Sequence, residues 1–252
     1  MELSVPEILG LAKETEINGV ELRVDEGMLT ELQEDKKTIS KVLDSEIRIC
    51  DIASSIFVRG EGETPLWKSY VKLAKDLSCP ALRVFAAANR LGVTDIDGII
   101  HDLKKLCDVA AEHNIEIWLE NHSELSEGKI CRQVLDAVNK KNLKILWDVL
   151  HSIEYGETIS ETLSYIGDFI SQVHLKDGVP NENGGEYKLC ALGEGSFPFA
   201  EVVESLRNIN FDGYLSLEWE SKWHPHLSGI YADNFELLIK YKEILQKAGA
   251  LK

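Results

Sequence analysis

Short β-rich segments alternate with longer segments of helical periodicity along most of the chain. Apolar and β-branched residues predict seven strands, over residues 19–24, 47–52, 81–86, 115–120, 143–148, 171–176 and 214–219. Apolar positions at i, i+3 and i+4 predict helices over residues 64–77, 96–110, 127–140, 159–169 and 198–209. A strand and a helix repeated at intervals of roughly thirty residues indicate parallel strands with right-handed crossovers. The candidate architectures are therefore an α/β barrel and an open, doubly wound sheet.

No segment rich in Pro, Gly and Ser divides the chain, so we expect residues 1–252 to form a single domain. The segment 177–198 is the most loop-like, and it follows a predicted strand, as active-site loops do. Glycines on both sides of Glu194 permit a tight turn before a helix that begins near Pro198. A phosphate group is one candidate ligand for that helix start, although no basic residue is adjacent.

Alternation within the predicted strands separates an apolar face from a polar one. Helices should cover the apolar face, which includes Ile117, Ile145, Leu175 and Leu217. The opposite parity carries polar residues at or near the C-terminal ends of four strands, namely Glu120, Asp148, His174 and Glu218. In a barrel these side chains would point inward at the mouth, where the loops after the strands assemble active sites.

Three carboxylates and one imidazole that converge on one place require a cation, because like charges repel one another. Three oxygen donors and one nitrogen favour one Mn²⁺ or Mg²⁺ ion, with Zn²⁺ or Co²⁺ as alternatives. A single strand-end carboxylate is more often solvated than metal-bound, but four residues at matching parity favour a shared metal site.

Other polar residues share the inward parity. His122 suits a contact to substrate or to the metal ligands, or else a loop cap. Lys176 suits either charge stabilisation on a substrate oxygen or an ion pair with Asp177. Glu21, Arg23 and Arg83 either line the pocket or pair with one another, and we favour the pairing.

Composition limits the function classes. A chain of 252 residues with 44% hydrophobic content is long enough to build a large core. The net charge of −16, without a basic stripe, argues against binding to nucleic acid. Five scattered cysteines without a C-x-x-C pair are typical of reduced thiols. With neither a signal-peptide pattern nor a membrane-spanning apolar run, we expect a soluble, cytoplasmic protein.

Five short motifs occur in order along the chain, namely LENH (119–122), WDVLH (147–151), VHLKDG (173–178), LGEG (192–195) and SLEWE (216–220). As an ordered set they resemble the xylose-isomerase-like TIM barrels of the sugar phosphate isomerase/epimerase family, which includes tagatose 3-epimerase, hydroxypyruvate isomerase and inosose-processing enzymes. The resemblance implies a TIM (β/α)8-type barrel that holds one divalent metal ion at the positions of Glu120, Asp148, His174 and Glu218. It also implies that Glu120 and Glu218 transfer protons and that His151 contacts substrate.

The chain departs from the family pattern at two points. Family members begin with a short strand, whereas residues 1–18 predict a helix that leads directly into the strand at 19–24. We therefore expect the first strand of the barrel to be absent or displaced. The exposed strand edges would need cover from a rearranged N-terminus or from a partner chain, for example in a homo-oligomer. The segment 174–185 also lacks the arginine that sugar epimerases place after the metal histidine, which leaves room for a substrate other than a free ketohexose.

The predicted function is that of an isomerase or epimerase of a small sugar, sugar phosphate or polyol derivative. A divalent ion would stabilise the enediolate that forms when a carboxylate removes the α-proton of a hydroxyketone. A dehydratase is a close alternative, because an enediolate with a β-leaving group can eliminate it. An apurinic-endonuclease-like DNA repair enzyme would need further metal ligands and a basic face, and a catalytically silent binding protein is the remaining alternative.

Overall fold

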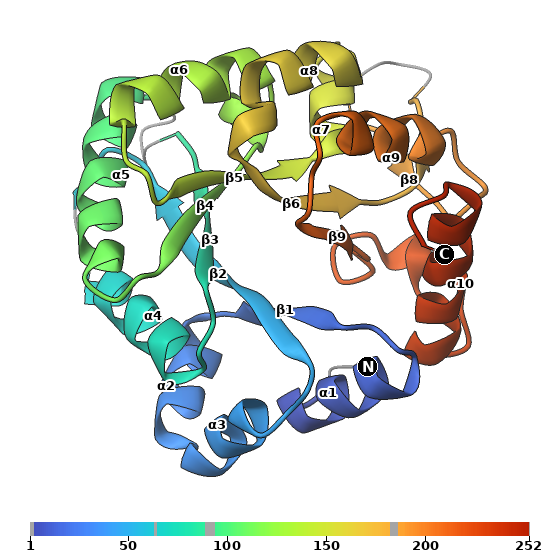
Figure 1. Cartoon of the computed structure of the whole chain (residues 1–252), viewed down its shortest axis with the longest axis horizontal. Coiled ribbons are helices and arrows are strands. Elements are labelled where there is room, and N and C mark those ends of the chain that lie inside the picture. The colour runs from blue at the N-terminus through green and yellow to red at the C-terminus, as the bar shows by residue number, and fades with distance from the viewer. Residues whose placement is uncertain (1–2, 63–64, 89–93, 182–185, 252) are drawn as a thin grey trace.

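A nearly closed barrel of parallel strands forms the centre of the molecule (Figure 1). The computed structural model describes residues 3–62, 65–88, 94–181 and 186–251. Its seven-stranded sheet consists of β1 (Gly19–Val24), β2 (Arg48–Val58), β3 (Ala81–Ala86), β4 (Glu116–Glu120), β5 (Leu143–Asp148), β6 (Ile170–Leu175) and β9 (Tyr214–Leu217). Neighbouring strands follow one another in chain order, whereas a doubly wound sheet reverses its order. The predicted barrel is therefore confirmed.

Helices surround the barrel on its outer side (Figure 1). They are α1 (Val5–Glu14), α2 (Glu26–Glu34), α3 (Lys36–Leu43), α4 (Pro65–Asp76), α5 (Ile96–Ala111), α6 (Gly128–Val138), α7 (Val149–Glu154), α8 (Ile159–Ile166), α9 (Phe199–Asn208) and α10 (Asn234–Lys247). The helix predicted within residues 1–18 corresponds to α1, and the other five predicted helices correspond to α4, α5, α6, α8 and α9. Residues 1, 2 and 64 of these predictions lie outside the described residues. None of the helices in the described part of the chain has the length and apolar character needed to cross a membrane.

The remaining elements are short. Three 3₁₀ turns, η1 (Ser123–Leu125), η2 (Gly167–Phe169) and η3 (Pro225–Leu227), join longer elements. The predicted loop 177–198 contains a small antiparallel pair, β7 (Gly178–Val179) with β8 (Lys188–Leu189), and residues 182–185 of this loop lie outside the described residues.

The strand parity predicted from the sequence is observed in the burial of the outer face. Ile117, Ile145 and Leu175 are fully buried beneath the helices. Leu217 is only partly buried, because β9 is an edge strand of the sheet. Helix starts are fixed locally: the Asp95 side chain accepts a hydrogen bond from the Gly98 N–H at the beginning of α5.

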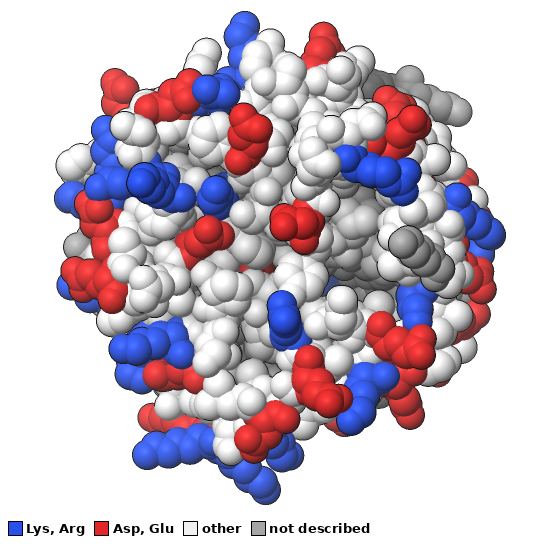
Figure 2. Space-filling view, in the orientation of Figure 1, with Lys and Arg blue, Asp and Glu red and all other residues white. Residues whose placement is uncertain are grey.

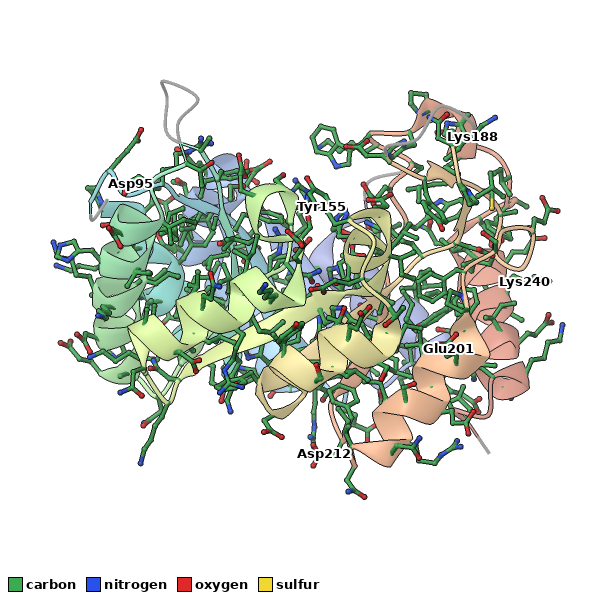
Figure 3. The ribbon with its side chains drawn as sticks, turned by 90° about the horizontal axis from the view of Figure 1, so that it is seen from above. Asp95, Tyr155, Lys188, Glu201, Asp212 and Lys240 are labelled. Carbon is green, nitrogen blue, oxygen red and sulfur yellow. The ribbon has the colours of Figure 1, made fainter. Side chains whose placement is uncertain are left out.

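The C-terminal ends of the strands gather at one end of the barrel. Figure 3 shows Asp95, Tyr155 and Lys188, which lie in the segments after β3, β5 and β6, at its upper end, and Asp212, which precedes β9, at its lower end. Figure 2 shows acidic and basic side chains interspersed on the face it displays, without a continuous field of Lys and Arg.

The barrel is open between β1 and β9. Within the described residues these two strands are the edges of the sheet, and no ladder of backbone hydrogen bonds joins them. We call this opening, flanked outside by α1 and α10, the seam. A cavity of about 1120 Å³ extends along it, from the apolar side chains of the two helices to His174 and Glu218 inside the barrel. The seam corresponds to the gap expected from the sequence.

Candidate metal centre

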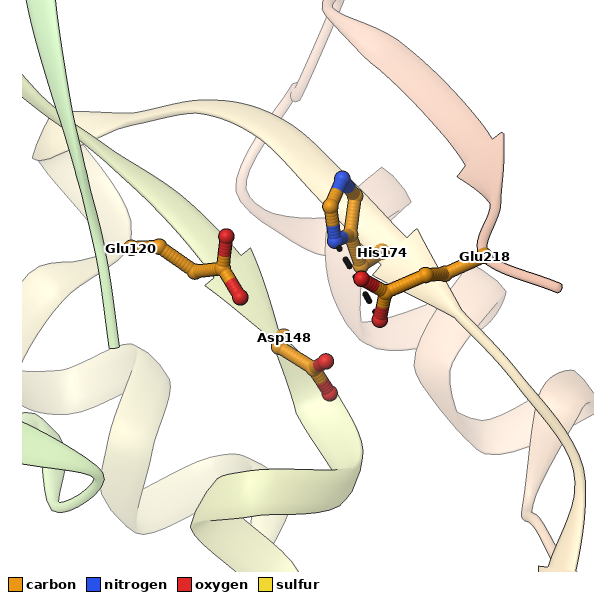
Figure 4. A group of neighbouring side chains, drawn as sticks. All are labelled: Glu120, Asp148, His174 and Glu218. Atoms are coloured by element: carbon orange, nitrogen blue, oxygen red, sulfur yellow. Dashed lines mark ion pairs between the residues drawn. The ribbon is translucent and has the colours of Figure 1, made fainter. Parts of the chain in front are cut away.

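Four polar side chains leave the barrel wall at the C-terminal ends of adjacent strands (Figure 4). Asp148 and His174 are register partners on β5 and β6, and His174 is the partner of Ser216 on β9. Glu120 ends β4, and Glu218 directly follows β9. One possible ligand atom from each of Glu120, Asp148, His174 and Glu218 lies within 4.8 Å of the other three. The structure thus brings together all four residues that strand parity selected, and we call them the metal group.

Buried atoms of the metal group that have no hydrogen-bond partner include His174 Nδ1 and Glu120 Oε2. His174 Nδ1 lies 3.6 Å from Glu218 Oε2 and faces the carboxylates. A buried polar atom without a partner costs roughly 1–3 kcal/mol, which a coordinated cation would relieve. Three carboxylates and one imidazole are suitable ligands for a divalent ion, so the residues present fit a metal.

The two glutamates of the metal group lie in different electrostatic surroundings. Burial raises the pKa of Glu120 to about 7, although Arg83, whose Nε lies 3.3 Å from Oε2, opposes the rise. Burial also acts on Glu218, but the nearby charges of Lys176 and His174 outweigh it and hold the pKa of that carboxyl well below its usual range. Environments that separate two carboxyl groups in this way are typical of acid–base pairs.

The Lys176 ammonium group lies among the carboxylates. Its Nζ is 2.7 Å from Asp148 Oδ2, 2.8 Å from Glu218 Oε2 and 2.7 Å from Glu220 Oε1. Burial alone would lower the pKa of Lys176, but these three carboxylates raise it well above its ordinary value. Sequence reasoning missed Glu220, although it shares the inward parity of Glu218 and could have been found from it.

Asp177, the ion-pair partner considered for Lys176, has other partners. Its Oδ1 accepts hydrogen bonds from the N–H groups of Gly178 (2.9 Å) and Phe197 (3.2 Å). Its Oδ2 accepts them from Gly193 (2.7 Å) and Gly195 (3.2 Å). The backbone donors that precede α9, where a phosphate was considered, therefore already bind a carboxylate.

His122 and His151 form one wall beside the metal group. Their ring centroids are 4.7 Å apart at an interplanar angle of 79°. Burial lowers the pKa of His122 to about 4. Burial also acts on His151, but Asp148, 3.4 Å from Nε2, and Glu154, 3.2 Å from Nδ1, raise its pKa to about 9. The wall thus pairs a neutral ring with a protonated one.

Comparison with known proteins assigns the fold to a family. Residues 9–241 match the model of the xylose isomerase-like TIM barrel family. The chain belongs to this family. The resemblance carried by the sequence motifs is thereby confirmed, and sugar epimerases and a dehydratase are found among the proteins that this chain resembles.

Three curated relatives each align with about half of this chain. An uncharacterised protein of Methanocaldococcus jannaschii is 29% identical over 130 residues, which cover 49% of this chain and 43% of that protein. D-psicose 3-epimerase of Enterocloster bolteae is 26% identical over 124 residues, or 47% of this chain and 38% of the enzyme. 3-Dehydroshikimate dehydratase of Bacillus anthracis is 24% identical over 135 residues, 48% of each chain. The matched stretches thus span less than half the length of these relatives.

Solved structures match this chain over nearly its whole length. A zinc-bound IolI protein superposes with a TM-score of 0.80 at 15% identity, covering 99% of this chain and 95% of that one. D-allulose 3-epimerase of Methylomonas sp. in complex with D-allulose gives a TM-score of 0.75 at 17% identity, covering 98% and 93%. At these identities the likeness demonstrates the fold.

Three charged residues on β1 and β3, which we expected to pair with one another, have other partners. Glu21 accepts a hydrogen bond from His174, and Arg83 pairs with Glu120. Arg23 lies over the ring of Trp223, 5.5 Å from its centroid. Each contact joins residues at least 37 positions apart in the chain, so neighbouring residues in the sequence carry no signal for it.

Asp148 is held by groups that the sequence did not single out. Its Oδ1 accepts hydrogen bonds from the N–H groups of Leu150 (3.0 Å) and His151 (3.4 Å) at the start of α7. Asn121 fixes the Asp148 backbone from both sides, donating to its carbonyl at 2.9 Å and accepting from its N–H at 2.6 Å. Asp148 Oδ2 is thereby left to face the other three members of the metal group. Asn121 lies inside the LENH motif, which was its only sequence signal.

Proposed function

We propose that this protein is a divalent-metal-dependent isomerase or epimerase of a small sugar or polyol derivative. The observation that carries the proposal is the convergence of four ligand atoms within 4.8 Å, with the buried His174 Nδ1 lacking a hydrogen bond. The residues that would hold the ion are Glu120, Asp148, His174 and Glu218. The oxygen-rich set favours Mn²⁺ or Mg²⁺, and the zinc-bound IolI structure supports Zn²⁺ as an alternative.

The proposed chemistry is proton transfer next to a carbonyl group. A bound divalent ion would supply Lewis acidity that polarises the carbonyl of an α-hydroxyketone and favours loss of the neighbouring proton. Glu120 and Glu218 come from β4 and the end of β9, with β5 and β6 between them, so they flank the space in which substrate would lie. One carboxylate would remove the α-proton and the other would return it to the opposite face, which inverts the carbon. If only one acts, the carbonyl moves instead.

The neighbouring cationic and imidazole groups suit the hydroxyls of such a substrate. His122 and His151 border the metal group and offer ring nitrogens to a bound molecule. Lys176 lies 2.8 Å from Glu218, where its ammonium group would stabilise negative charge on a substrate oxygen. These three residues are the proposed substrate contacts.

The hydrogen bonds of Asp177 favour a substrate without a phosphate group. The loop before α9 is a common phosphate site in barrels of this type, because its N–H groups point at the ligand. Here Asp177 accepts hydrogen bonds from Gly193, Gly195 and Phe197 in that loop. A substrate phosphate would have to displace this buried carboxylate.

A dehydratase is the second candidate. The match to 3-dehydroshikimate dehydratase of Bacillus anthracis supports it, as does the ammonium group of Lys176. After a carboxylate has removed the α-proton, Lys176 would donate a proton to a β-hydroxyl group, which would leave as water. An unsaturated ketone with ultraviolet absorption would then accumulate, whereas an epimerase produces none.

Solvent exchange tests the proposal directly. The chelator-treated protein would be supplied with Mn²⁺ in D₂O and offered ketoses, keto-polyols and sugar phosphates, with loss of the α-proton signal followed by NMR. We expect metal-dependent deuterium uptake into at least one substrate and none with His174→Ala. Glu116→Gln is the matched control, because Glu116 begins β4 and accepts a hydrogen bond from Trp118 Nε1 at 2.8 Å, far from the mouth. A wild-type protein that binds no divalent ion would refute the proposal.

A further inference from the structure

Glu21 connects the metal group to the open seam of the barrel. It lies on β1, a strand that carries no member of the metal group. His174 Nε2 lies 3.0 and 2.9 Å from its two carboxylate oxygens, and the Ser216 hydroxyl also donates to it. Since His174 and Ser216 are register partners on β6 and β9, Glu21 ties β1 to both strands on the far side of the seam.

The same contact sets the direction of the His174 ring. A carboxylate only accepts hydrogen bonds, so Nε2 acts as the donor to Glu21. Nδ1 is then the nitrogen that faces the metal group, 3.6 Å from Glu218 Oε2. A carboxylate behind a ligating imidazole fixes its orientation and increases its basicity.

β1 has limited support on its seam side. One edge pairs with β2, and the other faces the cavity of about 1120 Å³. Further along the seam, Lys242 Nζ donates to the Thr15 carbonyl at 2.9 Å and pairs with Glu16 at 2.8 Å, outside the barrel wall. Inside the barrel wall, no neighbouring strand forms backbone hydrogen bonds with this edge of β1 in the described residues. The side-chain contacts of Glu21 join β1 to β6 and β9 there instead.

We propose that Glu21 is a positioning residue that couples metal binding to the docking of β1 across the seam, an inference that rests on the proposed metal site. While β1 is docked, Glu21 holds His174 with Nδ1 toward the other ligands, and the metal binds more tightly. Because coupling between two equilibria is reciprocal, metal binding favours the docking of β1 by the same factor. A metal held by β4, β5, β6 and β9 thereby stabilises β1.

Two measurements on the full chain test this coupling. Calorimetric titration with Mn²⁺ gives the metal affinity, and hydrogen–deuterium exchange with and without Mn²⁺ gives the protection of residues 19–24. The variants are Glu21→Gln, Ser216→Ala and the strand-glutamate control Glu116→Gln. The visible spectrum of bound Co²⁺ reports whether the set of ligands is intact.

In the wild type and in Glu116→Gln, we expect Mn²⁺ to slow exchange in residues 19–24. Glu21→Gln should bind Mn²⁺ about 10- to 100-fold more weakly, the usual effect of removing the partner of a ligating histidine. Its Co²⁺ spectrum should stay like that of the wild type, because the four ligands remain, while the metal-dependent protection of β1 disappears. Ser216→Ala keeps the contact to His174, so it should lose less affinity than Glu21→Gln and still reduce that protection.

The outcomes separate this inference from the proposed function. If the wild type binds Mn²⁺ while Glu21→Gln binds it as tightly and β1 is still protected, the coupling is wrong and the metal site stands. A Co²⁺ spectrum that shows fewer ligands in Glu21→Gln would also overturn the positioning role, since Glu21 would then be a ligand. If the wild type binds no divalent ion, the proposed function fails, and the coupling fails with it.

Discussion

Replacing Lys176 by Met tests how strongly the acidic mouth depends on one buried cation. Methionine keeps much of the length and apolar character of the lysine stem and removes the ammonium group. Asp148, Glu218 and Glu220 then lose a partner at 2.7–2.8 Å. We expect the metal-free protein to be destabilised and Mn²⁺ to restore much of the loss, because the ion brings positive charge to the same carboxylates.

The magnitude follows from the burial of each partner. The Asp148 side chain is fully buried, and breaking a buried ion pair costs about 3–5 kcal/mol. The Glu218 and Glu220 side chains are 26% and 21% exposed, so solvent screening limits each of their contributions to about 0–1 kcal/mol. The total loss is therefore about 3–7 kcal/mol. In a chain of this size 1 kcal/mol changes Tm by about 2–4 °C, so Tm should fall by roughly 6–28 °C.

Thermal unfolding with and without Mn²⁺ provides the assay. A hundredfold excess of Mn²⁺ over its Kd stabilises the native state by about 2.7 kcal/mol, and the resulting gain in Tm should be larger in Lys176→Met than in the wild type. Lys72→Met is the control, since Lys72 forms an exposed pair with Asp76 and its removal should change Tm little. If Lys176→Met unfolds within about 2 °C of the wild type without metal, the assigned role of this buried cation is wrong.

Three further predictions concern the catalytic base, the loop held by Asp177 and binding to nucleic acid. Glu218→Gln should lower α-proton exchange by about 10² or more while calorimetry still detects Mn²⁺ binding; near-wild-type exchange would move the base to Glu120. In Gly195→Ala the added Cβ would lie 2.0 Å from Asp177 Oδ1, so urea unfolding should show a loss of about 1–3 kcal/mol. Gly10→Ala, with no atom within 4 Å of the new Cβ, should show no loss. The net charge of −16 predicts no binding to an abasic-site duplex at physiological salt, and tight binding with a steep salt dependence would contradict it.

The strands and the inward direction of their side chains are predictable from the sequence because both depend on a local two-residue period. The segment 143–148 shows this best: its apolar positions gave the outer face, and the same alternation placed Asp148 at the mouth beside His174. The same alternation could have identified Glu220, which lies two residues after Glu218 and shares its predicted inward direction.

Partners across the barrel were not predictable in the same way. The contact of Glu21 with His174 joins residues 153 positions apart, and it forms only because the sheet curves until its two edges approach one another. The choice of Asp148, Glu218 and Glu220 over Asp177 as partners of Lys176 likewise depends on tertiary closure. The helix α7 was missed because six residues are too few to show a helical period.

The Asp177 carboxylate occupies backbone N–H groups that a bound anion would need, so it competes with anions for this loop. The carboxylate is tethered to the donors it binds, so its effective concentration there is about millimolar or higher, and a dilute phosphate ester competes poorly. Asp177→Ala would release the N–H groups of Gly178, Gly193, Gly195 and Phe197 together. Acquisition of a phosphorylated substrate in this scaffold would therefore begin with the loss of an acidic side chain and would not require a new basic residue.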